Sequence, residues 1–154
     1  MRELPVLPSL CRLTPIVSLA LAALAAVGCT SIPLEGRARI ERALPEQARA
    51  LPAAAIARAT VHDDTYASIQ LIRISEPIAL HRHLQSEEIV YLLSGAGVLH
   101  LRDENVELCA GDLAVIPRNT PHGFTPTGAE PAVVLSTFVP PFVEGDRVME
   151  AVAR

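Results

Sequence analysis

From residue 67 onward, the chain alternates short apolar runs with turn residues at close spacing. The runs are rich in Val, Ile and Leu, and Pro, Gly, Asp and Asn separate them. This pattern is typical of an all-β sandwich or barrel. Pro140 and Pro141 end the last run, because proline has no N–H to donate to a strand ladder, and a short helix is expected in the tail behind them. The pattern predicts eight strands, near residues 67–75, 78–83, 88–94, 97–102, 105–109, 113–117, 122–126 and 131–139.

The beginning of the chain has a different character. Residues 13–27 are largely apolar, follow Arg2 and Arg12, and lead into Gly28-Cys29. An apolar stretch of this length suits a cleaved signal better than a membrane span. It resembles a bacterial lipoprotein signal, which implies a signal peptide over residues 1–28, a lipid on Cys29, and a place in the periplasm or at the outer membrane. The alternative is an ordinary secretory signal that is cleaved nearby.

Residues 29–60 are rich in Ala, Arg, Glu and Pro. Residues 36–44 have the apolar spacing for two helical turns, and Pro45 is expected to stop them. We therefore interpret residues 29–60 as a tether with a marginal helix. The remaining residues, 61–154, are enough for a single small domain with its own core.

Four metal-capable side chains follow one another in the predicted strands. His81 and His83 are two positions apart on one strand, so they point to the same face. Glu88 opens the next strand after a turn, and His122 enters a later strand behind a proline-bracketed turn. Three imidazoles and one carboxylate suit a divalent first-row metal, with Fe, Mn, Ni, Cu and Zn all compatible. An octahedral metal held by four ligands keeps two positions open for substrate, water or O₂.

The spacing of these residues resembles the two motifs of the cupin superfamily. The first motif is met by His81, His83, Glu88 and Gly95, with Ser75 in place of its leading glycine. The second is met by Gly111, Pro117 and His122, with Asn119 and Pro126 replacing a glycine and an asparagine. Asparagine tolerates positive φ, so Asn119 is a mild departure. The resemblance covers residues 67–142 and implies a double-stranded β-helix (jelly-roll) barrel of one cupin domain, with the metal on His81, His83, Glu88 and His122.

Three further residues bear on a pocket or on reactivity. Phe124 lies two residues after His122 and should share its face, either as a pocket wall or as plain core packing. His100 alternates with leucines and faces either the cavity or the solvent. Cys109 is expected to be a small buried hydrophobe rather than a reactive thiol.

Composition limits the kinds of partner. A net charge of −4 argues against nucleic acid. The resemblance implies a metal-dependent enzyme, a dioxygenase or other oxygenase or an isomerase, that acts on a small oxygen-rich molecule. The alternative is a non-catalytic module of the cell envelope that binds or senses a metal or a small ligand. Contact with the membrane is expected only through a lipid anchor, and a homodimer is compatible with the resemblance.

Overall fold

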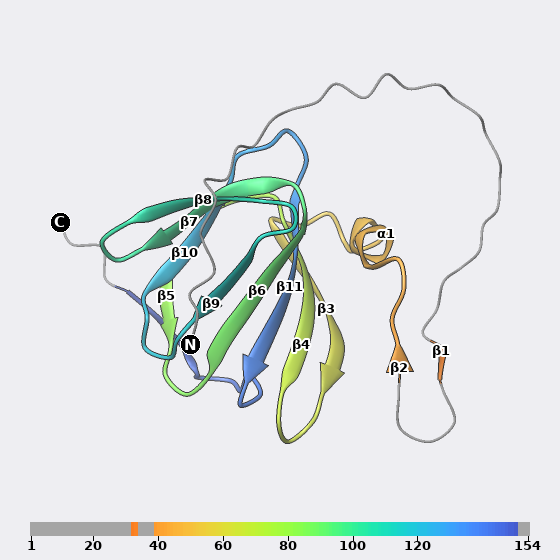
Figure 1. Cartoon of the computed structure of the whole chain (residues 1–154), viewed down its shortest axis with the longest axis horizontal. Coiled ribbons are helices and arrows are strands. Elements are labelled where there is room, and N and C mark those ends of the chain that lie inside the picture. The colour runs from red at the N-terminus through yellow and green to blue at the C-terminus, as the bar shows by residue number, and fades with distance from the viewer. Residues whose placement is uncertain (1–31, 34–38, 151–154) are drawn as a thin grey trace, which may run out of the picture.

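Two five-stranded antiparallel sheets face each other in the computed structural model, which describes residues 32–33 and 39–150 (Figure 1). The strand order is β12-β5-β10-β7-β8 in one sheet and β3-β4-β11-β6-β9 in the other. This arrangement confirms the predicted all-β jelly roll. The strands of the two sheets are β3 (Ile56–Asp63), β4 (Ser68–Ile74), β5 (Ile78–His83), β6 (Glu87–Ser94), β7 (Ala96–Leu101), β8 (Asn105–Cys109), β9 (Leu113–Ile116), β10 (His122–Pro126), β11 (Ala132–Val139) and β12 (Arg147–Met149).

The eight predicted strands correspond to β4 through β11, and two strands of the barrel lie outside the prediction. Strand β3 begins at Ile56, inside the predicted tether, and pairs with β4 along its length. It mixes two alanines with Arg58, His62 and Asp63 and has no apolar run, so its sequence looks like a linker. Strand β12 takes the place of the short helix expected in the tail, because it pairs with β5.

The helix of the predicted tether is displaced along the chain. A short pair of strands, β1 (Ile32–Pro33) and β2 (Arg39–Ile40), precedes α1 (Leu44–Arg49). The helix therefore begins where Pro45 was expected to stop it. Proline is accepted in the first helical turn because the N–H that it lacks would have no partner there.

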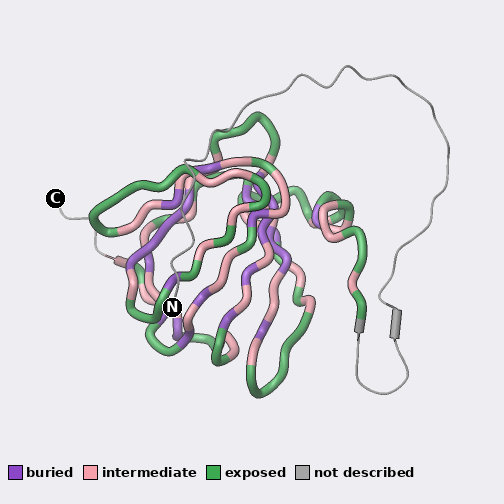
Figure 2. The backbone as a smooth tube through the Cα atoms, viewed as in Figure 1, coloured by how far each residue is buried: buried purple, intermediate pink, exposed green. Residues whose placement is uncertain are grey.

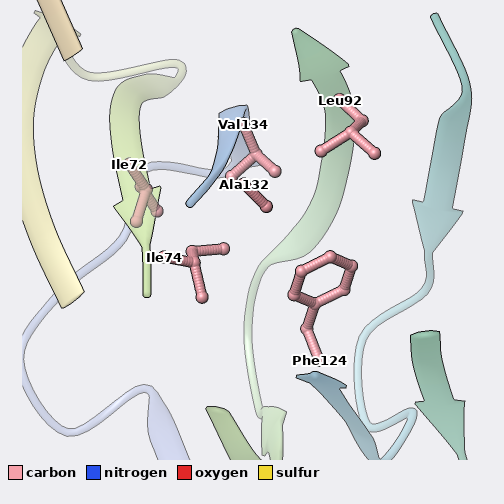
Figure 3. Close-up of a cluster of buried hydrophobic side chains, with 6 residues drawn as sticks. All are labelled: Ile72, Ile74, Leu92, Phe124, Ala132 and Val134. Atoms are coloured by element: carbon pink, nitrogen blue, oxygen red, sulfur yellow. The ribbon is translucent and has the colours of Figure 1, made fainter. Parts of the chain in front are cut away.

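Apolar side chains form the core between the two sheets. Its buried residues come from β4, β6, β10 and β11 (Figure 3). Buried positions run along these strands, whereas the turns are exposed (Figure 2). The strands alternate faces, so every second residue enters this core. The cluster consists of Ile72, Ile74, Leu92, Phe124, Ala132 and Val134.

A second apolar cluster covers the outer face of the sheet that contains β4 and β11. Leu71 and Val133, the alternates of the inner residues, pack there against Ala48 of α1. Figure 1 shows the helix beside β3 and β4. Leu44, which is partly buried, also packs against this cluster from the first turn of α1. Residues 44–51 are therefore part of the folded domain, which extends the domain beyond its predicted start at residue 61.

Two turns need a left-handed backbone. Gly111 has a φ of +100°, and Asn119 has a φ of 61°. The prediction that Asn119 adopts the conformation usual for a glycine is thereby confirmed. Its backbone N–H donates to the carbonyl of His83 at 2.7 Å, which fixes the turn before β10 against β5.

The predicted signal peptide, residues 1–28, and the predicted lipidation site Cys29 lie outside the described residues. Among the residues that the structure does describe, no helix is both long enough and apolar enough to cross a membrane.

Gly97 gives a direct test of the packing around Phe124. A Cβ atom at position 97 would lie 2.1 Å from Cζ of the Phe124 ring. We expect Gly97→Ala to lower the free energy of unfolding by about 1–3 kcal/mol, because the ring must leave its place in the core. Urea denaturation measures the change. Gly128→Ala is the matched control, since a Cβ there meets nothing closer than 3.5 Å, and equal midpoints for both variants would contradict the packing described.

Candidate metal centre

The four predicted ligands lie together at the interface of the two sheets. His81 and His83 belong to β5, and His122 belongs to the neighbouring strand β10, where it pairs directly with His81. Glu88 reaches the cluster from β6 of the facing sheet. All four side chains are buried, and each offers one ligand atom within 4.8 Å of the others. Strands far apart in sequence thus bring a mixed imidazole and carboxylate set to one point.

The separations within the cluster match those of ligands around one ion. Oε2 of Glu88 lies 3.0 Å from Nε2 of His122 and 3.6 Å from Nε2 of His83. Two donor atoms bound at right angles to a metal, each about 2.1 Å from it, are separated by about 3.0 Å. The donor set therefore fits a divalent cation without rearrangement of the strands.

Hydrogen bonds orient the three imidazoles. Nδ1 of His81 bonds to the carbonyl of Ala79 at 2.9 Å, and Nδ1 of His122 bonds to the carbonyl of Thr120 at 2.8 Å. A carbonyl only accepts, so each Nδ1 carries the proton and each Nε2 is left as the possible ligand atom. The His122 ring is then flanked by acceptors on both sides, since its Nε2 faces Glu88. Either a second proton or a cation must therefore lie between Nε2 of His122 and Oε2 of Glu88.

The Glu88 carboxylate is held in its charged form. Its Oε1 accepts a hydrogen bond from Oγ of Ser136 at 2.7 Å, which leaves Oε2 toward the imidazoles. Burial raises the pKa of Glu88, but the hydrogen bond and charge of His122, with Ser136 and His83, outweigh burial and bring the pKa below its ordinary value. The cluster therefore contains one fixed negative charge.

The two histidines of β5 are neutral at neutral pH. Burial lowers the pKa of His81 to about 4, with a further contribution from the neighbouring His122. Burial also lowers the pKa of His83, although Glu88 opposes it. A metal binds only the neutral ring, so burial keeps both side chains ready to bind at neutral pH.

Asp146 is part of the site but was not found in the sequence. It is fully buried, accepts the backbone N–H of Gln85 at 2.6 Å, and lies 3.2 Å from Nδ1 of His83. Burial raises its pKa, but the Gln85 N–H and His83 outweigh burial and lower it. Asp146 thus sets the orientation of His83. The only signal in the sequence was a Gly-Asp pair after two prolines.

The cluster faces a pocket between the sheets, and the apolar residues of its walls include Phe124, Phe138 and Phe142. Phe124 lines this pocket, on the same face as His122. His100 does not line it: the ring bonds to Asn105 Oδ1 at 2.7 Å and to Thr125 Oγ1 at 2.8 Å. Its neighbour Leu99 takes the inward position, so alternation turns His100 away from the cavity.

Cys109, on β8, is only partly buried, which differs from the expected buried side chain. It does not line the pocket.

Comparison with known proteins identifies the family. The cupin domain model matches residues 70–138. An uncharacterised protein of Methanocaldococcus jannaschii is 32% identical over 97 residues, which are 59% of this chain and 78% of the relative. The chain therefore belongs to the cupin family.

Solved structures agree with this assignment. Pac13, a nucleoside dehydratase from Streptomyces, is 26% identical with a TM-score of 0.55, over 62% of this chain and 78% of Pac13. A conserved protein of Klebsiella pneumoniae with a double-stranded β-helix domain has a TM-score of 0.61 and 20% identity, over 71% of this chain and 96% of that protein. At 20% identity, the likeness to the Klebsiella protein shows a shared fold alone.

The role of Asp146 can be tested by a nearly isosteric change. Asp146→Asn keeps the shape but removes the charge that orients His83, and we expect metal affinity to fall about 10- to 100-fold. Competition with a fluorescent chelator measures the affinity. Glu144→Gln, an exposed acidic residue two positions away, is the control. Unchanged affinity in Asp146→Asn would show that His83 is oriented without it.

Proposed function

We propose that this protein is a metal-dependent enzyme, an oxygenase or an isomerase, that acts on a small oxygen-rich molecule. The observation that carries the proposal is the ligand cluster itself: His81, His83, Glu88 and His122 lie within 4.8 Å of one another and line the pocket. A purely structural site would be closed by protein ligands on all sides. Here the cluster borders a cavity, so a ligand in the cavity has access to it.

A divalent metal at this site would supply Lewis acidity to an oxygen of the bound molecule. The protein's own contribution is to hold the imidazoles of His81 and His83 neutral, to keep Glu88 ionised, and to surround the bound molecule with apolar walls. Such walls exclude water, which strengthens every electrostatic interaction inside. The solved structure of a Pac13 variant with uridine shows that a related barrel accepts a small polar molecule.

A second candidate function is a non-catalytic module that binds a metal or a small ligand. The reason to consider it is that the polar residues of the pocket are poorly suited to acid–base catalysis. Apart from the four ligands, the polar side chains in its lining are Arg58, Gln70, Ser136 and Arg147. None of these is an ordinary general acid or base near neutral pH. Catalysis would therefore depend on the metal alone, and a binding module needs no such group.

Metal content and turnover separate these candidates. We expect about one divalent metal per chain, and we expect the double variant His81→Ala, His83→Ala to lose it, since two of the four ligand atoms are removed. Elemental analysis of protein purified without a chelating column measures the content, with His100→Ala as the control histidine outside the cluster. Normal metal content in the double variant would refute the site.

Oxygen uptake and NMR product analysis on a panel of small oxygen-rich compounds then test for turnover. An enzyme loses turnover on chelation and regains it on reloading. Ligand binding without turnover across the panel would favour the binding module.

Under the same proposal, the protein is exported and anchored by a lipid on Cys29. The support is the sequence alone: an apolar stretch over residues 13–27 that leads into Gly28-Cys29. The domain would then work at the cell envelope, in the periplasm or at the outer membrane, and would contact the membrane only through the lipid.

Metabolic labelling tests the anchor. We expect labelled palmitate to enter the wild-type protein in a bacterial host and to be absent from Cys29→Ser, because the thiol is the acceptor. Cys11→Ser serves as the control cysteine within the predicted signal peptide. Equal labelling of wild type and Cys29→Ser would rule out lipidation at this residue.

A further inference from the structure

Two arginines line the pocket, one from each sheet. Arg147 of β12 pairs directly with His83 of β5, so both side chains lie on the same face of that sheet. Arg58 of β3 pairs with the core residue Ile72, which places it on the inner face of the other sheet. Both arginines belong to the lining of the cavity that holds the ligand cluster.

Neither guanidinium has an acidic partner in the described part of the chain. Nη2 of Arg147 lies 3.5 Å from Nδ1 of His81, but that nitrogen donates to Ala79 and offers no lone pair. Nε of Arg147 is buried and has no hydrogen-bond partner. Buried N–H groups are nearly always paired in folded proteins. An unpaired one beside a cavity indicates an acceptor that arrives with a ligand.

The charge of the pocket leads to the same conclusion. Its lining contains two arginines and a single acidic residue, Glu88, which the histidines and Ser136 already engage. A divalent metal on the cluster would add two more positive charges. Such a pocket binds an anion most readily.

We infer that the pocket binds a small organic acid, whose carboxylate pairs with Arg147 and whose hydrocarbon part lies against the apolar walls. The inference rests on the proposed function, because the rest of the molecule would face the metal. A guanidinium matches a carboxylate with two parallel hydrogen bonds. Arg58 is more exposed than Arg147 and would strengthen the attraction from the solvent side.

The chain offers a matched control for Arg147. Arg82 lies on β5, next to both histidine ligands in sequence, and pairs across the strands with Val148. It points away from the pocket, and its guanidinium forms an ion pair with Glu150. Removing its charge changes the net charge of the protein as much as removing that of Arg147, without altering the pocket.

Isothermal titration of the Mn²⁺-loaded protein with acetate, malonate, succinate and benzoate tests the inference, with the corresponding amides as uncharged probes. We expect at least one acid to bind at least about 10-fold more tightly than its amide. Arg147→Gln should weaken that binding by at least about 10-fold and Arg58→Gln by less. Arg82→Gln should leave it unchanged, and circular dichroism and Mn²⁺ content should be the same in all three variants.

The inference would be overturned by no binding of any acid below about 10 mM, by equal binding of acid and amide, or by wild-type affinity in Arg147→Gln. Tighter binding of inorganic phosphate than of every acid, lost in Arg147→Gln, would also overturn it. Failure of the proposed function looks different, because the wild type would then retain no Mn²⁺. In that case the titration is repeated on metal-free protein, where binding that depends on Arg147 supports the inference and its absence refutes it.

Discussion

The buried carboxylate of Glu88 is the constraint on which the arrangement of the two sheets depends. A charge removed from water must be compensated by nearby dipoles or charges. Glu88 obtains one hydrogen bond from Ser136 in its own sheet and faces His122 and His83 across the barrel. These contacts fix how closely the sheets approach at this point. The same contacts bring the imidazoles within reach of one another, so the site and the spacing of the barrel have a common cause.

Much of this structure follows from local sequence patterns. Strands β4 to β11 are short apolar runs between turn residues, and the motif spacing brings the four ligands together because each sits at a fixed place in a strand or turn. The missed strands lack such signals. Strand β3 has no apolar run and β12 has only three residues, so both depend on the strand that pairs with them. Arg58, Asp146 and Arg147 come from these two segments or just beside them, which is why the polar surroundings of the ligands could not be foreseen.

The barrel and the ligand cluster are features of the family, whereas the chemistry of a cupin depends on what surrounds them. In this chain the surroundings are apolar except for a few polar groups. The two arginines stand on edge strands, one in each sheet. Edge strands tolerate changes of sequence better than central ones, because fewer neighbours depend on them. The part of the pocket that would select a ligand can therefore vary while the ligand cluster on the central strands stays the same.

The hydrogen bond between His83 and Asp146 joins residues 63 positions apart. Closing such a long loop is slow compared with the pairing of adjacent strands. The contacts that offset its entropy cost form only after most of the barrel has formed. His83 thus acquires its final orientation only when residues 146–149 have added their strand beside β5. Until that last strand is in place, the nascent barrel would hold a cation loosely. Full metal affinity is therefore expected only once residues 147–149 are paired with β5.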